Sequence, residues 1–98
     1  MRKLNSKEKS LVQKLLELAN IDVNTNELLV SEMDDGGMGS LAIGDNHKAR
    51  MFGGRIAEFE FRDDDGVVIS ACLNVDRDNE LYELDVWKVD FSPTKCLK

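Results

Sequence analysis

The spacing of the apolar residues changes once along the chain, from a helical to a strand-like period, and this change limits the fold most. Between residues 6 and 20, apolar side chains recur at intervals of three and four, which gathers them on one face of a helix. These residues are Leu11, Val12, Leu15, Leu16, Leu18 and Ala19. Asn5 and Glu8 have the spacing of a capping box. The sequence therefore predicts a helix over residues 6–20, which the Asn- and Asp-rich run 20–26 ends.

Apolar and polar residues then alternate, as they do in strands with one buried face. We expect strands over residues 27–33, 40–43, 55–62, 67–73 and 81–91, separated by turns rich in Asp, Asn and Gly. The Asp-Asp-Gly-Gly run that follows the first of these strands favours a hairpin, because glycine supplies the positive φ angles of tight turns. A long loop is expected over residues 44–54.

One helix and about five strands predict an α+β fold in which the N-terminal helix packs on an antiparallel sheet. A chain of 98 residues supports one hydrophobic core, so we expect a single domain over residues 1–98. The face of the sheet away from the helix would carry Glu58, Glu60, Glu83 and Asp85, which alternate with the apolar positions.

The last strand contains the single tryptophan, Trp87, and the sequence leaves two interpretations of it open. In a regular strand, the alternation would put Trp87, Val89 and Phe91 on the same face as Glu83 and Asp85. The buried face is therefore expected to switch near residue 86 or 87. With a switch, Trp87 anchors the core under the helix. As an exposed aromatic among acids, it instead resembles an interface hot spot.

Charge is distributed unevenly along the chain. The net charge is -6, but residues 1–20 carry five basic and two acidic groups, so the other 78 residues carry -9. An acidic protein is a poor ligand for nucleic acid or an anionic membrane, whose binding depends on Lys and Arg. Because the sequence has no apolar run of membrane-spanning length and no signal-type segment, we expect a cytoplasmic location.

Few residues in the sequence suggest catalysis, and we expect no enzyme activity and no cofactor. His47 is the only histidine, so any serine or cysteine triad would have to include it. Six of the seven glycines lie between residues 36 and 54, without the lysine of a phosphate-binding loop. A small enzyme or ligand binder that uses the Gly-rich segment 34–54 with His47 and Arg50 remains the alternative.

The acidic residues 74–80 and the two cysteines are the other candidates for metal or redox chemistry. The alternating series Asn74, Asp76, Asp78 and Glu80 resembles the ligands in the first half of an EF-hand loop. In a loop that starts at Asp76, however, Leu81 and Trp87 occupy the glycine and bidentate glutamate positions. We therefore expect no metal site. Cys72 lies in a strand and Cys96 near the C-terminus, with no CxxC spacing, so we expect no disulfide.

The acids predicted on the free sheet face form the main candidate site. Like charges crowded on one face destabilise a sheet unless basic groups meet them. Those groups are either internal, from Arg55, Arg62 and Lys88, or belong to a basic protein partner. The candidate partner-binding residues are Glu58, Glu60, Asp63, Asp64, Asp65, Glu83 and Asp85.

Two segments carry a resemblance to a known group of proteins: DGGMGSL at residues 35–41 and ELDVWKVDFSP at residues 83–93. With the preceding amphipathic helix, they resemble a family of small bacterial proteins of unassigned function over nearly the whole chain. In size, charge and architecture the chain also resembles immunity proteins of bacterial toxin systems, including contact-dependent growth inhibition.

The second resemblance implies a cytoplasmic immunity-type protein whose acidic surface blocks a basic toxin domain, for example a nuclease. Such a protein binds no nucleic acid and no membrane itself. A third hypothesis is a self-associating domain that forms a homodimer through a sheet edge or through the face of Trp87, so both monomer and homodimer stay open.

Overall fold

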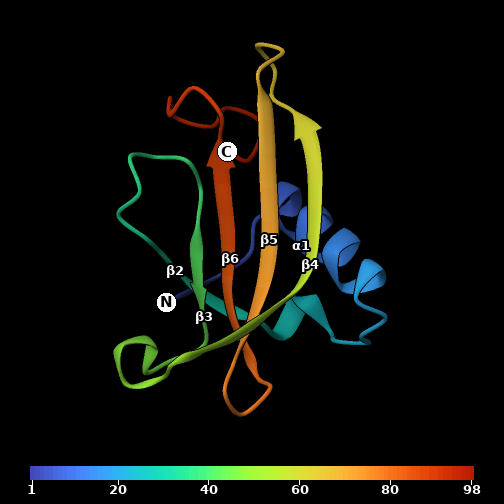
Figure 1. Cartoon of the computed structure of the whole chain (residues 1–98), viewed down its shortest axis with the longest axis vertical. Helices are drawn as coiled ribbons and strands as arrows, with labels where there is room; N and C mark the ends of the chain where they lie inside the picture. Colours follow the sequence, from blue (N-terminus) through green and yellow to red (C-terminus); the bar gives the residue numbers. More distant parts are fainter.

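The protein is described by a computed structural model that covers all 98 residues. It contains one α-helix and six strands (Figure 1). The elements in chain order are β1 Arg2–Lys3, α1 Ser6–Leu18, the 3-10 turn η1 Thr25–Glu27, β2 Leu29–Glu32, β3 Leu41–Ile43, the 3-10 turn η2 His47–Ala49, β4 Phe52–Arg62, β5 Val68–Asp76 and β6 Leu81–Lys88.

All six strands form one antiparallel sheet in the order β1-β2-β3-β6-β5-β4. The α+β class and the antiparallel sheet are confirmed, but the expected number of about five strands is wrong. The additional strand is β1, where Arg2 pairs with Val30 and Lys3 with Leu29. Two residues are too few to show a strand period, so only the pairing with β2 reveals this strand.

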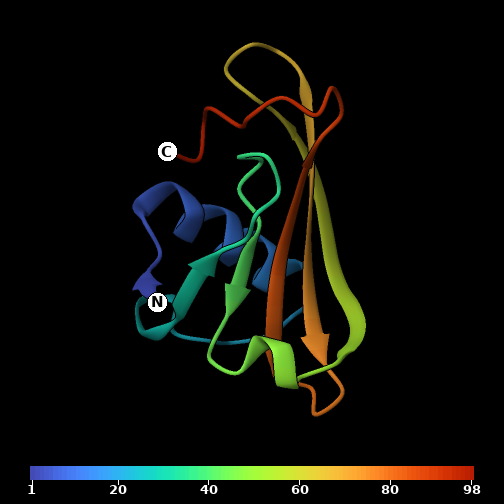
Figure 2. The ribbon, with the colours of Figure 1, turned by 90° about the vertical axis from the view of Figure 1, so that its left-hand side faces the viewer.

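Helix α1 covers one face of the sheet and leaves the other face free. In Figure 1 the helix lies behind β4 and β5, and Figure 2, turned by 90°, shows it on one side of the strands only. The helix buries Leu11, Val12, Leu15 and Leu16 against the sheet. The sheet side of this core consists of Val30, Leu41, Ile43, Ile69, Ala71, Leu73, Leu84 and Val86.

The start of α1 confirms the capping box. The Asn5 side chain accepts a hydrogen bond from the backbone N–H of Glu8 at 2.7 Å, and the Glu8 carboxylate accepts one from the N–H of Asn5 at 2.9 Å. Glu8 is buried and also binds both terminal nitrogens of Arg2, which fixes β1 against the helix. The helix ends at Leu18, two residues earlier than predicted, because Asn20 adopts a left-handed φ of 58°.

Two predicted boundaries are wrong in the second half of the chain. The expected loop over residues 44–54 contains η2, and β4 already begins at Phe52. The last strand ends at Lys88 and does not continue to Phe91, so the buried face does not switch. Val86 and Lys88 are 1% and 0% exposed, whereas Trp87 between them is 46% exposed. Lys88 therefore takes the buried position at the end of β6, and Trp87 lies on the opposite, exposed face of the strand.

Burial of Lys88 is possible because two carboxylates meet its ammonium group. Its Nζ donates hydrogen bonds to Asp63 at 2.8 Å and to Asp65 at 2.6 Å, both in the β4–β5 turn. The buried Asp63 carboxylate also accepts the backbone N–H groups of Lys95 and Cys96. This cluster ties the end of β6 to the β4–β5 turn and to the C-terminal tail, which crosses the end of the sheet towards the helix side in Figure 2.

Candidate functional site

The uncovered face of the sheet carries the predicted acids in two adjacent rows. In the first row, Glu58 of β4 lies opposite Cys72 of β5, which lies opposite Asp85 of β6. In the next row, Glu60 lies opposite Ser70, and Ser70 lies opposite Trp87. Glu83 follows on β6 with the same parity, so the expectation that Glu58, Glu60, Glu83 and Asp85 share the free face is confirmed.

Five of the seven candidate acids are exposed: Glu58, Glu60, Asp64, Asp65 and Asp85. Asp65 is bound to Lys88, and we call the other four, Glu58, Glu60, Asp64 and Asp85, the acidic surface. Glu60, Asp64 and Asp85 have no ion-pair partner within the chain. Glu58 pairs with Arg55 at 3.0 Å, but both side chains are more than half exposed, so this pair is weak. Internal compensation of the surface is therefore incomplete.

The carboxylates of the other three candidate acids are bound by side chains of the same chain. Asp63 is only 5% exposed, because its carboxylate accepts hydrogen bonds from Lys88 and from the C-terminal tail. The expectation that Asp63 lies on a binding surface is therefore wrong. Asp65 is bound to the same lysine. The carboxylate of Glu83 is bound by His47 at 2.6 Å and is only 19% exposed. Local sequence patterns could not separate these acids from the exposed ones, because their partners lie far away in the chain.

An exposed aromatic pair borders the acidic surface at the end of β6. The rings of Trp87 and Phe91 lie 5.9 Å apart between centroids, and the two residues are 46% and 69% exposed. Val89, between them in the chain, is 44% exposed. Phe91 adopts a left-handed φ of 61°, which is unfavourable for a bulky side chain by about 1 kcal/mol. The fold thus holds two large rings in water at some energetic cost.

A hollow of about 410 Å³ lies between Trp87 and the β2–β3 connection, beside Asp85. Cys72 lies at its floor and is 9% exposed. Burial raises the pKa of the Cys72 thiol; Arg55 opposes this effect, and the carboxylates of Asp85 and Glu58 add to it. A thiol with a raised pKa is a poor nucleophile at neutral pH, so this hollow fits binding better than cysteine catalysis.

His47 forms the second cluster of possible chemical interest. Its imidazole stacks on the Tyr82 ring with centroids 4.7 Å apart, and its Nε2 meets Glu83 at 2.6 Å. Arg50, from the same connection, binds Asp76 and the backbone oxygens of Ile43 and Leu81. The enzyme hypothesis requires a carboxylate next to His47, and Glu83 provides it. Cys72 takes no part in this cluster. Together with Arg50, the contact docks the β3–β4 connection on the sheet.

We predict that His47→Ala lowers the free energy of unfolding by about 1 kcal/mol, because it removes one charge-assisted hydrogen bond and one ring stack. Urea denaturation measures this change. The exposed neighbour Lys48, which makes no side-chain bond, provides the control Lys48→Ala, for which we expect no change. If His47→Ala were as stable as the wild type, the docking role would be wrong.

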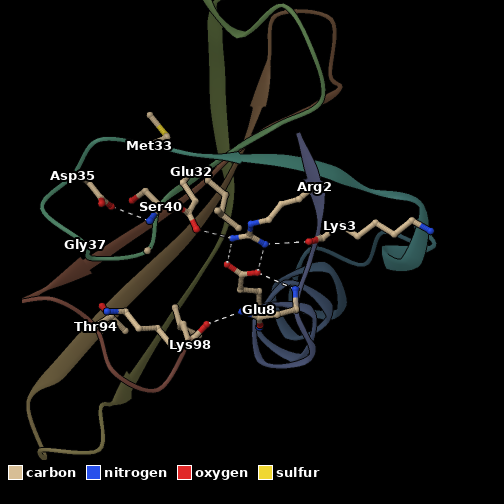
Figure 3. Close-up of a pocket in the computed structure, with 14 residues that line it drawn as sticks. Arg2, Lys3, Glu8, Glu32, Met33, Asp35, Gly37, Ser40, Thr94 and Lys98 are labelled. Carbon is tan, nitrogen blue, oxygen red and sulfur yellow. Dashed lines mark hydrogen bonds and ion pairs between the residues drawn. The ribbon is translucent and has the colours of Figure 1, made fainter.

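The largest cavity lies elsewhere, where β1, the start of α1, the β2–β3 connection and the C-terminal tail meet (Figure 3). It measures about 640 Å³, and only three of its 14 lining residues are hydrophobic. Its charged groups satisfy one another: Arg2 bridges Glu8 and Glu32, and the Asp35 carboxylate accepts the backbone N–H groups of Met38 and Ser40. The Asn5 side chain donates to the carbonyl oxygen of Leu97, which joins the two ends of the chain. No buried side-chain group is left unpaired for a ligand.

The two turns considered for ligands have structural tasks. In the Gly-rich turn, Gly36 and Gly37 adopt φ angles of 74° and 81°, which confirms the hairpin. In the β5–β6 turn, Asp76 accepts the backbone N–H groups of Asp78 and Glu80. No group of three His, Cys, Asp or Glu side chains is arranged to hold a metal ion. Both cysteines are free thiols.

Fold and site together define a small α+β protein whose sheet is covered by a helix on one face and presents acids and aromatic rings on the other. The chain belongs to the family described as Domain of unknown function (DUF6984), whose model matches residues 1–98. No curated protein and no solved structure matches the chain. The only helix is too short and too polar to span a membrane.

Proposed function

We propose that this protein is a cytoplasmic binding module of the immunity type, which blocks a basic partner domain through the acidic surface and the Trp87–Phe91 pair. The observation that carries the proposal is the position of exposed, unpaired carboxylates next to two exposed rings on the one sheet face that no helix covers. Interfaces with such a composition combine aromatic anchors with charge complementarity.

Charge and aromatic contacts would contribute to binding in different ways. The residues after position 20 carry -9, which attracts a basic partner over the Debye length and raises the association rate. Trp87 and Phe91 would be desolvated in the complex, and burial of large rings lowers the dissociation rate. The cationic side chains of the partner would meet Asp85 and Glu58, beside the hollow.

An enzymatic function has weaker support. The raised pKa of Cys72 disfavours a thiolate nucleophile, and His47 is engaged with Glu83 and Tyr82 in docking a loop. The largest cavity is lined by groups that already bind one another. A nuclease toxin, which must carry basic groups to bind its substrate, is the partner class that we propose.

We predict that Asp85→Lys slows association with the basic partner about tenfold at low salt and flattens its salt dependence, because it reverses a charge in the centre of the surface. Wild-type protein immobilised on beads is first tested with the product of the neighbouring gene and with lysate of the source organism. Surface plasmon resonance with the purified partner then measures the association rates.

Glu17→Lys is the matched control, since it makes the same charge change on the exposed side of α1, away from the acidic surface. It should leave the association rate near that of the wild type. Trp87→Ala should mainly speed dissociation, by about 30-fold for a hot spot of about 2 kcal/mol. The proposal fails if no basic protein is retained, or if Asp85→Lys and Glu17→Lys behave alike.

A further inference from the structure

The outer edge of β4 is the longest unpaired strand edge in the molecule. β4 spans Phe52–Arg62 and pairs only with β5, because it ends the sheet order. The other edge strand, β1, has two residues. Proteins usually protect a long edge with proline, inward-pointing charge or a bulge, because its free N–H and C=O groups pair readily with another strand. β4 contains no proline, and its bulges lie before Ala57, so residues 57–62 form a regular open edge.

The hydrogen bonds of the β4–β5 hairpin show which backbone groups point outward. The N–H of Asp63 donates to the carbonyl oxygen of Val67 across the hairpin at 2.9 Å. Because the backbone groups of every second residue point the same way, the N–H and C=O groups of Phe61 and Phe59 also point towards β5. The alternate residues Glu58, Glu60 and Arg62 therefore direct their N–H and C=O groups away from the sheet. Figure 1 shows this edge at the side of the sheet, with no other strand beside it.

The side chains along this edge are complementary to their own copy in one antiparallel register. With a two-fold axis beside Glu60, Glu58 lies opposite the partner's Arg62 and Arg62 opposite the partner's Glu58. On the helix side, Phe59 lies opposite the partner's Phe61. These phenyl rings stack at 5.9 Å and are only half-buried, so a second strand would cover their remaining exposed surface. A register shifted so that Glu58 faces the partner's Glu60 would instead bring four acids together.

We propose that β4 is a homodimer interface, in which the β4 strands of two copies pair in this register and join the two sheets into one. Backbone hydrogen bonds from Glu58, Glu60 and Arg62 of each copy hold the pair, and the two Glu58–Arg62 contacts select the register. The uncovered sheet face of each copy stays open at Asp85 and Trp87, whereas Glu58 and Glu60 belong to both this interface and the acidic surface. Pairing through the acidic face itself is disfavoured, because like charges would meet.

Paired charge reversals test this register directly. In the register that we propose, Glu58→Lys alone places Lys opposite the partner's Arg62, and Arg62→Glu alone places Glu opposite the partner's Glu58. Each single variant should raise the dimer dissociation constant by about tenfold or more. In an equimolar mixture the two variants attract each other at both contacts, so a heterodimer should form.

Native mass spectrometry distinguishes the heterodimer from either homodimer by mass, and sedimentation equilibrium gives the dissociation constants. The wild type should rise from 11.0 kDa towards twice that mass with concentration. Glu60→Pro, which removes an outward N–H but no bond to β5, should be monomeric with an unchanged circular dichroism spectrum. Glu60→Gln should tighten the dimer, because it removes the like-charge contact at the axis.

Three outcomes would overturn the interface. A wild type that stays monomeric up to about 1 mM excludes a dimer of measurable strength. A dimer that survives Glu60→Pro pairs elsewhere. A mixture of the two charge-reversal variants without excess heterodimer excludes this register.

Discussion

Lys88→Met is expected to lower the free energy of unfolding by about 3 kcal/mol, although it replaces a charged side chain by an apolar one of similar length at a fully buried position. The reason is that the buried carboxylate of Asp63 loses its only cationic partner. Only its hydrogen bonds from backbone N–H groups remain. Breaking a buried ion pair on one side leaves an uncompensated charge. Urea denaturation at neutral pH measures the loss.

Two further variants test whether the broken Lys88–Asp63 ion pair causes the loss of stability. Lys95→Met removes a lysine that is 61% exposed and 3.9 Å from Asp65, and it should leave stability unchanged. Lys88→Met combined with Asp63→Asn removes both charges and should be more stable than Lys88→Met alone. If the double variant is instead less stable than Lys88→Met, the uncompensated charge is not the source of the loss.

The same cluster determines part of the acid sensitivity. Burial alone would raise the pKa of Asp63, but hydrogen bonds from Lys88 and from the backbone N–H groups of Lys95, Asp64 and Cys96 hold it well below its usual range. In the unfolded chain an aspartate takes up a proton near pH 4. The stabilisation is therefore present above pH 5 and is lost as the pH falls towards 2. The difference in stability between wild type and Asp63→Asn should shrink over this range.

Gly53→Ala is expected to destabilise the fold by about 2 kcal/mol, because an added methyl group would overlap backbone that cannot move. A Cβ on Gly53 would lie 2.2 Å from the carbonyl oxygen of Asp76. That segment is held in place: the N–H of Asp76 donates to Glu80, and the N–H of Arg77 donates to Met51 at 3.0 Å. Overpacking of this kind forces backbone shifts. Thermal or urea unfolding measures the effect.

Gly54 provides the matched control one residue further along the strand. A Cβ on Gly54 meets no atom within 4 Å, and neither glycine has a positive φ. Gly54→Ala should therefore change the free energy of unfolding by less than about 0.5 kcal/mol. An equal loss of stability at both positions would contradict a steric origin of the effect at Gly53.

The buried lysine also connects stability with the proposed binding surface. The carbonyl oxygen of Lys88 accepts the N–H of Phe91 at 2.9 Å, which closes the turn that presents Phe91 beside Trp87. The ion cluster on the helix side of the sheet thus fixes the strand end whose aromatic rings lie on the other side. Loss of the cluster should therefore weaken partner binding as well as folding.

Local signals allowed much of the fold to be predicted. The capping box at Asn5 and Glu8 gave the start of α1, because a capping box needs only four consecutive residues. The alternation around Phe59 and Phe61 gave β4 and its exposed acids, because side chains on a strand alternate between two faces. The candidate acids Glu58, Glu60 and Asp85 lie on the free face for the same reason.

Other parts of the site depended on contacts between distant residues. Glu83 and Asp85 have the same parity on β6, yet only Glu83 is bound, because the β3–β4 connection brings His47 to it. The alternation along the last strand left two positions open for Trp87, the core and the surface. In the structure its side chain is exposed. Its neighbour Lys88 could be buried only because the β4–β5 turn supplies Asp63 and Asp65.

The sequence by itself determined the helix, the alternating strands and the separation of a basic N-terminal segment from an acidic remainder. These features follow from residue spacing and composition, which act over a few positions. Only the tertiary structure decided which acids stay free, which lysine is buried and which strand ends the sheet. A charge can leave water only where an opposite charge meets it, and residues 63 and 88 meet because the chain has folded.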